Sequence, residues 1–188
     1  MYNPYYLNAI SNVLTQQTTN YKRVYLVRFD LHFPNSWSDK DHGAISRFIE
    51  AFKARLVVWD KQRKSPTGIG FSYVWVREQH ESHNWHYHLV FMFNKDSIAH
   101  LGKFDLNHSN LCSKIATSWA SALGLDEREA VNLVHFCQNG QYYLDANSPD
   151  IPNQFNAVMQ RLSYLAKTHS KDIGDGHRHL GRSQKPFL

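Results

Sequence analysis

The stretch Trp-His-Tyr-His-Leu-Val-Phe-Met-Phe-Asn, residues 85–94, alternates between two kinds of side chain and therefore predicts a β-strand. Its odd-numbered positions are all apolar, whereas His86 and His88 occupy the opposite face. Because side chains two residues apart on a strand point the same way, both imidazoles can reach one divalent cation. The strand is a candidate metal site, although paired histidines also arise by chance in a chain with 12 of them.

A second strand is predicted over residues 24–33, where apolar side chains again alternate with others. Arg28, Asp30 and His32 share its polar face. Apolar residues at helical spacing follow over 45–59 and predict a helix that covers the apolar face of the sheet.

A third strand is predicted over residues 70–79, only a short loop at 80–84 before the histidine strand. A connection this short predicts an antiparallel hairpin. Symmetric pairing about the loop brings Glu78 close to His86.

Later segments complete the predicted fold. Residues 109–123 have apolar side chains in helical phase, and residues 131–145 indicate one or two strands broken at Asn139-Gly140. A last helix is predicted over 153–172. The order β-α-β-β-α-β plus this helix predicts an α+β domain of the split βαβ type, ferredoxin-like or RNA-recognition-like. Helices would cover one face of its antiparallel sheet, and the metal and a tyrosine would share the other.

Composition predicts one domain over residues 1–188, with a short helix or irregular lead-in at 1–22 and a basic C-terminal tail at 173–188. The net charge of +5 and the pI near 9.2 favour an anionic partner, nucleic acid first. Two widely spaced cysteines suggest neither a disulfide framework nor a zinc knuckle. We find no export signal, membrane span or Walker loop, so we expect a cytoplasmic protein without membrane contact or nucleotide cofactor.

The last predicted helix carries a second chemical element. Its apolar side chains form one stripe, and Tyr164 falls opposite that stripe with Lys167 three residues later. The ammonium group can then lie beside the phenol, stabilise negative charge on its oxygen and hold a phosphate. A tyrosine so placed can act as a covalent nucleophile, although a partly exposed tyrosine without a catalytic role is more common.

These motifs together resemble those of the HUH endonuclease superfamily, which contains rolling-circle replication initiators, relaxases and single-strand transposases. Within it, the chain is most similar to inovirus-type replication proteins and the YagK/YfjJ C-terminal domain family. The resemblance covers residues 24–183, and its motifs are the Phe-Asp-Leu strand near the start, Trp75-Val76-Arg77-Glu78-Gln79, His86-Tyr87-His88, Tyr164-Leu165-Ala166-Lys167 and His179-Leu180-Gly181-Arg182-Ser183.

The resemblance implies a single-tyrosine endonuclease that nicks and rejoins single-stranded DNA through a 5′-phosphotyrosine. Such an enzyme would initiate rolling-circle replication of a phage, prophage or plasmid. Tyr164 would be the nucleophile, and Lys167 would steady the phosphate or the phenolate. His86 and His88 would be ligands of Mn²⁺ or Mg²⁺, with Glu78 chosen as third ligand on the hairpin geometry.

Further residues enter this prediction in supporting roles. His80 and His83 in the loop compete with Glu78 as third ligand, and Asp30 and His32 could orient an imidazole from behind. The partners implied are a single-stranded replication origin and a host helicase and polymerase in the cytoplasm of a bacterial host cell. The basic side chains that could follow the DNA phosphates are Arg161, Lys171, Arg178 and Arg182.

Three alternatives stay open. A noncatalytic RNA-recognition-like module would bind single strands, but the aromatic side chains expected on its open face are missing, because those positions are His, Val and Met. A metal-dependent hydrolase that uses activated water would need the metal but not Tyr164. A single-strand transposase of the same superfamily would share the chemistry.

Overall fold

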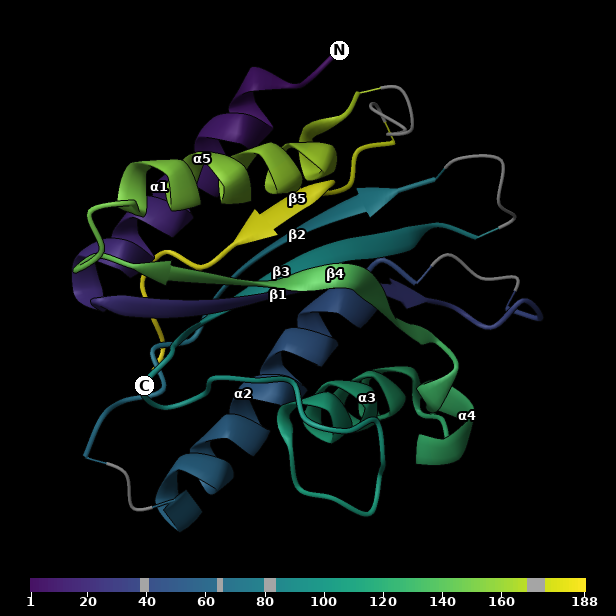
Figure 1. The fold of residues 1–188 in the computed structure, drawn as a ribbon. Helices are drawn as coiled ribbons and strands as arrows, with labels where there is room; N and C mark the ends of the chain where they lie inside the picture. Colours follow the sequence, from purple (N-terminus) through teal and green to yellow (C-terminus); the bar gives the residue numbers. More distant parts are fainter. Residues whose placement is uncertain (38–40, 64–65, 80–83, 169–174) are drawn as a thin grey trace.

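The computed structural model describes residues 1–37, 41–63, 66–79, 84–168 and 175–188 (Figure 1). Its elements in chain order are α1 (Pro4–Asn20), β1 (Arg23–His32), α2 (Ala44–Arg63), β2 (Ser72–Glu78), β3 (His86–Asn94), α3 (Leu111–Leu123), α4 (Glu127–Val131), β4 (Val134–Asp145), α5 (Ile151–Leu162), the 3₁₀-helix η1 (Ser163–Ala166) and β5 (Leu180–Arg182). The five strands form one sheet in the order β4-β1-β3-β2-β5, with antiparallel neighbours throughout.

The strand order confirms the predicted α+β class. Strands β4-β1-β3-β2 have the split βαβ arrangement, in which α2 connects β1 to β2 and α3 lies between β3 and β4 along the chain. The hairpin register also agrees with the prediction, because Glu78 pairs directly with His86. On the other side of β3, Asp30 pairs with His88 and His32 with His86. The sheet thus gathers the polar residues of three strands.

The first hydrophobic core lies between the sheet and α2 with α3, as the alternation predicted. Aromatic side chains from the odd positions of β1 and β3 fill it. Phe91 is fully buried, and its ring centroid lies 4.9 Å from that of Phe29 and 4.7 Å from those of Phe52 and Phe71. Large buried rings of this kind contribute much of the apolar area removed from water.

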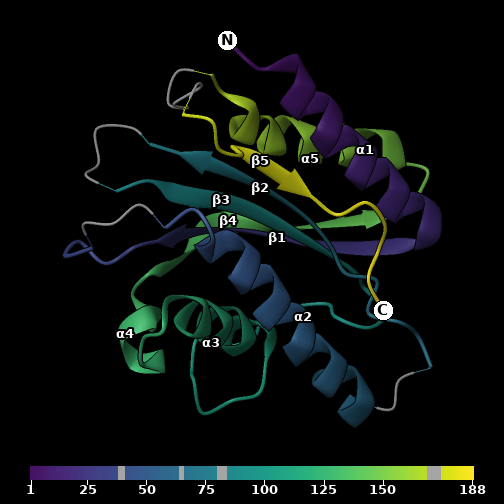
Figure 2. The same cartoon turned by 180° about the vertical axis from the view of Figure 1, so that it is seen from behind.

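A second core lies on the opposite face, beneath α1 and α5, so helices cover both faces rather than one (Figures 1 and 2). The reason is that this face is polar only at one end. Leu26, Val76, Val90 and Met92 also point to it, and such a run of apolar side chains requires cover. The lead-in expected at 1–22 is largely α1, whose apolar stripe is buried against these strands.

Two further boundaries differ from the predictions. The last helix does not continue to residue 172: α5 ends at Leu162, one 3₁₀ turn follows, and Lys167 has an extended backbone with φ −59° and ψ 138°. Residues 173–188, predicted as a tail, include β5, which pairs with β2. Without β5, strand β2 would be an edge strand with unpaired backbone N–H and C=O groups, and β5 pairs with them. Among the described residues, no helix has the length and apolar content needed to cross a membrane.

Gly181 controls the docking of β5. A Cβ atom at this position would lie 2.3 to 2.5 Å from three atoms of the Trp75 indole, which is itself buried. We therefore expect Gly181→Ala to lower the free energy of unfolding by about 1–3 kcal/mol through overpacking. Urea unfolding measures this loss. Gly43→Ala is the control, because the nearest atom there belongs to the flexible end of the Arg47 side chain; equal effects of the two substitutions would contradict the prediction.

Candidate metal centre and tyrosine site

The register of β2 and β3 brings three possible metal ligands to one point. His88 Nε2 lies 2.7 Å from Glu78 Oε2 and 3.2 Å from His86 Nε2. The ligand atoms of all three residues lie within 4.8 Å of one another. Glu78 and His88 are buried and His86 is half-buried, so the group faces a partly enclosed space.

The distances between these atoms fit a hard divalent cation. Ligand atoms about 2.1 Å from one ion lie about 3.0 Å apart when they are adjacent in an octahedron. The two short distances around His88 Nε2 lie on either side of this value. One carboxylate and two imidazoles form a donor set that accepts Mn²⁺ or Mg²⁺. The residues present therefore fit the predicted ion. The competing ligands His80 and His83 lie outside the described residues.

Asp30 holds the His88 ring from the other side. Its Oδ1 lies 2.6 Å from His88 Nδ1, which leaves Nε2 directed toward Glu78 and His86. Burial is the largest effect and opposes a charge on either residue, but hydrogen bonds and opposite charges together outweigh it. His88 thereby lowers the pKa of Asp30, and Asp30 together with Glu78 raises the pKa of His88. A carboxylate behind a histidine in this way fixes the orientation of a metal-binding ring. Asp30 thus lies where the sequence predicted a supporting residue.

His86 and His32 form a neutral pair of rings at the edge of the group. Their ring centroids lie 5.1 Å apart with nearly parallel planes. Burial, followed by the nearby charge of His88, lowers the pKa of His86 to about 4. Burial also lowers the pKa of His32. A neutral imidazole keeps its nitrogen lone pair free for a metal ion, so His86 is available as a ligand at neutral pH.

Tyr164 lies beside this group, on the 3₁₀ turn that follows α5. Its ring centroid is 5.7 Å from that of His88, and the two rings meet edge to face. The guanidinium of Arg28 and the ammonium of Lys167 lie 4.5 Å and 4.2 Å from the centroid of the Tyr164 ring. Residues three apart eclipse each other in a 3₁₀ turn, which places Lys167 over the ring without the predicted helix.

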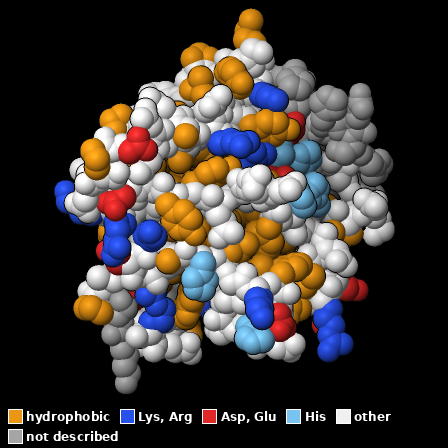
Figure 3. Space-filling view, in the orientation of Figure 1, with side chains coloured by type: hydrophobic (Ala, Val, Ile, Leu, Met, Phe, Trp, Pro, Cys, Tyr) orange, Lys and Arg blue, Asp and Glu red, His pale blue; other side chains and the backbone are white. Residues whose placement is uncertain are grey.

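The tyrosine borders a hollow of about 450 Å³. Among the described residues that line it, three are basic and none is acidic, which favours an anionic ligand. The face seen in Figure 3 carries histidine and basic side chains next to one another. The residues that line the hollow are Tyr2, Arg28, Gln160, Arg161, Ser163, Tyr164 and Lys167.

The predicted DNA-binding residues do not all meet at this hollow. Arg161 lines it, whereas Arg178 lines a separate cavity of about 330 Å³ with Arg77 and residues of α2. Arg182 lies on β5, opposite Val74, and Lys171 falls outside the described residues. Of the four, only Arg161 is brought to Tyr164 within the described part of the chain.

Arg28 also belongs to this site, although the sequence pattern assigns it no role there. Alternation along β1 indicates only that it lies on the polar face of the strand. Its guanidinium contacts the Tyr164 ring, and its buried Nε has no hydrogen-bond partner among the described residues. Its contact with Tyr164 joins residues 136 positions apart in the sequence, so local patterns do not reveal it.

We expect one Mn²⁺ ion to bind per chain at the Glu78, His86 and His88 group. Glu78→Gln keeps the shape of the side chain but removes its charge, so the Mn²⁺ affinity should fall at least about 10-fold. Isothermal titration calorimetry measures the affinity. Glu50→Gln, on the exposed side of α2, is the matched control and should bind as the wild type does. An unchanged affinity in Glu78→Gln would exclude this carboxylate as a ligand.

Comparison with known proteins places the chain among close relatives. The sequence model of the YagK/YfjJ C-terminal domain family matches residues 2–183. Uncharacterized protein YagK of Escherichia coli (strain K12) is 37% identical, over 95% of this chain and 92% of its own length. Uncharacterized protein YfjJ of the same strain is 35% identical, over 95% and 93%. No solved structure matches the chain. The family match includes every residue of the metal and tyrosine group.

Proposed function

The chain belongs to the YagK/YfjJ C-terminal domain family, and from this premise and the geometry of the site we propose that it is a tyrosine endonuclease of the HUH type. It nicks and rejoins single-stranded DNA and initiates rolling-circle replication. One observation carries the proposal: a tyrosine whose ring contacts two cations lies against the ring of a histidine whose Nε2 faces Glu78 and His86.

The ion would be held by Glu78, His86 and His88. Bound there, Mn²⁺ or Mg²⁺ would supply positive charge that stabilises the scissile phosphate. Asp30 keeps the His88 ring in one orientation through the hydrogen bond to Nδ1. The donor set and its spacing support this assignment.

Tyr164 supplies the nucleophile. Its oxygen forms a bond to phosphorus while the bond from phosphorus to the 3′ oxygen breaks, and the phenol proton passes to solvent as the leaving oxygen takes one up. The products are a 5′-phosphotyrosine and a free 3′-hydroxyl that can prime DNA synthesis. Arg28 and Lys167 offset the charge that builds on the phosphate and on the phenol oxygen.

The covalent intermediate conserves the energy of the phosphodiester bond. A 3′-hydroxyl that attacks the phosphotyrosine restores the DNA strand and frees Tyr164, so joining needs no nucleotide cofactor. Arg161 and Lys167 in the basic hollow hold the DNA backbone next to the scissile bond. In this role the protein works in the bacterial cytoplasm with a host helicase and polymerase.

The proposal is tested by incubating the full chain with labelled single-stranded circular DNA from its replicon and Mn²⁺. A metal-dependent covalent protein–DNA band on a denaturing gel is the expected result. A shift on a native gel without any cleavage would replace the proposal with a noncatalytic binding module. Exchange of strands between two DNA ends, without rejoining of the original circle, would favour the single-strand transposase.

A further inference from the structure

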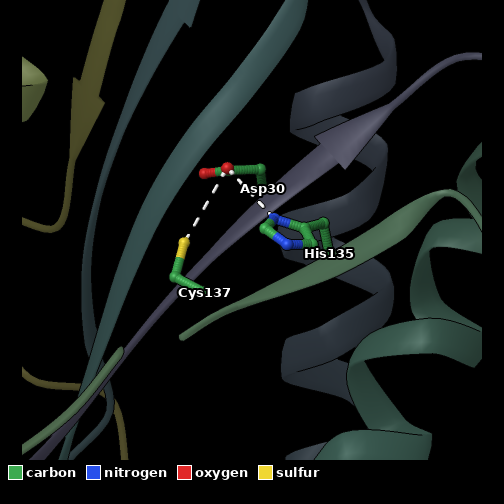
Figure 4. A group of neighbouring side chains, drawn as sticks. All are labelled: Asp30, His135 and Cys137. Carbon is green, nitrogen blue, oxygen red and sulfur yellow. Dashed lines mark hydrogen bonds and ion pairs between the residues drawn. The ribbon is translucent and has the colours of Figure 1, made fainter. Parts of the chain in front are cut away.

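Figure 4 shows a second group of possible metal ligands, which are Asp30, His135 and Cys137. Asp30 faces this group with Oδ2, whereas its Oδ1 contacts His88. Asp30 Oδ2 is 3.6 Å from His135 Nδ1 and 3.8 Å from Cys137 Sγ. The three ligand atoms lie within 4.8 Å of one another. Both new partners come from β4, which adjoins β1 on the side opposite β3. The proposed function uses neither of them.

An irregularity in β4 brings both side chains to one carboxylate. His135 pairs with Asp30, but beyond Phe136 the register shifts, so that four residues of β4 lie opposite a single residue of β1. A Cβ atom at Gly140 would lie 2.7 Å from the carbonyl oxygen of Cys137, so this bulge requires glycine. Bulges redirect side chains near functional sites, and here the Cys137 thiol meets Asp30.

The donors and their spacing indicate a different ion from that of the first site. An oxygen, a nitrogen and a sulfur ligand around a tetrahedral zinc ion lie about 3.4–3.6 Å apart. The two measured distances from Asp30 Oδ2 come within about 0.2 Å of that range. Thiolate sulfur favours Zn²⁺ over Mg²⁺ or Mn²⁺. The His135 side chain is 65% exposed, which gives an ion access from solvent and leaves room for water as fourth ligand.

We propose that Asp30, His135 and Cys137 form a Zn²⁺ site, and that an ion bound there weakens the Glu78, His86 and His88 site. The link is Asp30, whose Oδ1 holds His88 Nδ1 while its Oδ2 faces the thiol. Zinc draws electron density from this carboxylate, adds positive charge beside His88 and displaces the thiol proton to solvent. The two ions therefore bind with negative coupling, which is reciprocal. The zinc site and the coupling do not depend on the proposed function; only an effect of zinc on DNA cleavage would rest on it.

The site itself is tested with Co²⁺, a spectroscopic substitute for zinc, added to the full chain without DNA. Wild type should show a thiolate-to-cobalt charge-transfer band that one equivalent of Zn²⁺ removes. Cys137→Ser should lack the band, and His135→Ala should bind Co²⁺ at least about 10-fold more weakly. Cys112→Ala is the control, because that cysteine is buried elsewhere, and it should retain the band. A wild type without the band, or a Cys137→Ser variant that keeps it, overturns the site.

The coupling is tested by calorimetric titration of Mn²⁺ with and without one equivalent of Zn²⁺. The Mn²⁺ affinity of the wild type should fall about 10-fold with zinc, and that of Cys137→Ser should not change. If zinc weakens Mn²⁺ binding equally in both proteins, it competes directly at the first site and the coupling is overturned. These experiments contain no DNA, so their outcome does not depend on whether the protein nicks DNA.

Discussion

Tyr164→Phe is expected to abolish the covalent protein–DNA adduct and to lower cleavage of single-stranded DNA about 10⁴-fold or more. The change removes one oxygen atom, and with it the proposed nucleophile, while the ring keeps its contacts with His88, Arg28 and Lys167. Loss of a nucleophile has effects of this size because the remaining groups can only bind and polarise the phosphate. A denaturing gel with labelled DNA and Mn²⁺ measures both the adduct and the cleaved strand.

Tyr143→Phe is the matched control for this experiment. Tyr143 is 46% exposed, and its ring packs against Tyr25, in the core on the other side of the sheet. Its hydroxyl donates to the carbonyl of Ala99, far along the chain from the tyrosine site. Cleavage should therefore stay within about 2-fold of wild type. Cleavage that persists in Tyr164→Phe would instead assign the chemistry to activated water and contradict covalent catalysis.

His88→Ala is expected to lower the Mn²⁺ affinity by more than about 100-fold and the free energy of unfolding by about 3 kcal/mol. The side chains of His88, Asp30 and Glu78 are 6%, 12% and 9% exposed, so the two carboxylates lose a buried partner that water replaces poorly. Calorimetry measures the first effect and urea unfolding with a chelator the second. His108→Ala, at an exposed imidazole paired with Asp105, should change stability by no more than about 0.5 kcal/mol.

The stability difference between wild type and His88→Ala should depend on pH. Because the pKa of Asp30 is lowered, its contribution is present above its unfolded value near 3.8 and is lost as the pH falls through the folded value. Because the pKa of His88 is raised, its contribution is full below 6.5 and is lost as the pH rises through the folded value. The difference should be largest between about pH 4 and 6.5. A difference that grows steadily into alkaline pH would contradict the ion pair.

The sequence predicted the parts of the site that depend on strand periodicity. Alternation has a period of two and is set locally, so it identified which face carries His86 and His88. The short loop then determined the hairpin register and the meeting of Glu78 with His86. Asp30 was placed on the same face, but its pairing with His88 depends on the order of strands, which only the assembled sheet provides.

The parts that the sequence did not reveal arise from contacts between distant segments. Val90 and Met92 on the supposedly open face were the local signal that helices cover it, yet nothing local identifies α1 and α5 as the cover. The sequence indicates the bulge that directs Cys137 to Asp30 only as a break in the predicted strand at Asn139-Gly140. The predicted helical phase placed Tyr164 and Lys167 together correctly, although the backbone there is a 3₁₀ turn.

The histidines on β3 and the Tyr164 side chain differ in how firmly the fold holds them. Strand β3 is hydrogen-bonded on both sides and almost entirely buried, so we expect its amide protons to exchange with solvent only through global unfolding. Tyr164 lies on a 3₁₀ turn whose next residues, Leu165 and Ala166, are fully buried, but Tyr164 itself is 37% exposed. We therefore expect the proposed metal ligands to keep one arrangement while the exposed Tyr164 ring changes its rotamer. Such freedom would suit the proposed reaction, in which the phenol oxygen and a DNA hydroxyl attack the same phosphorus atom in turn.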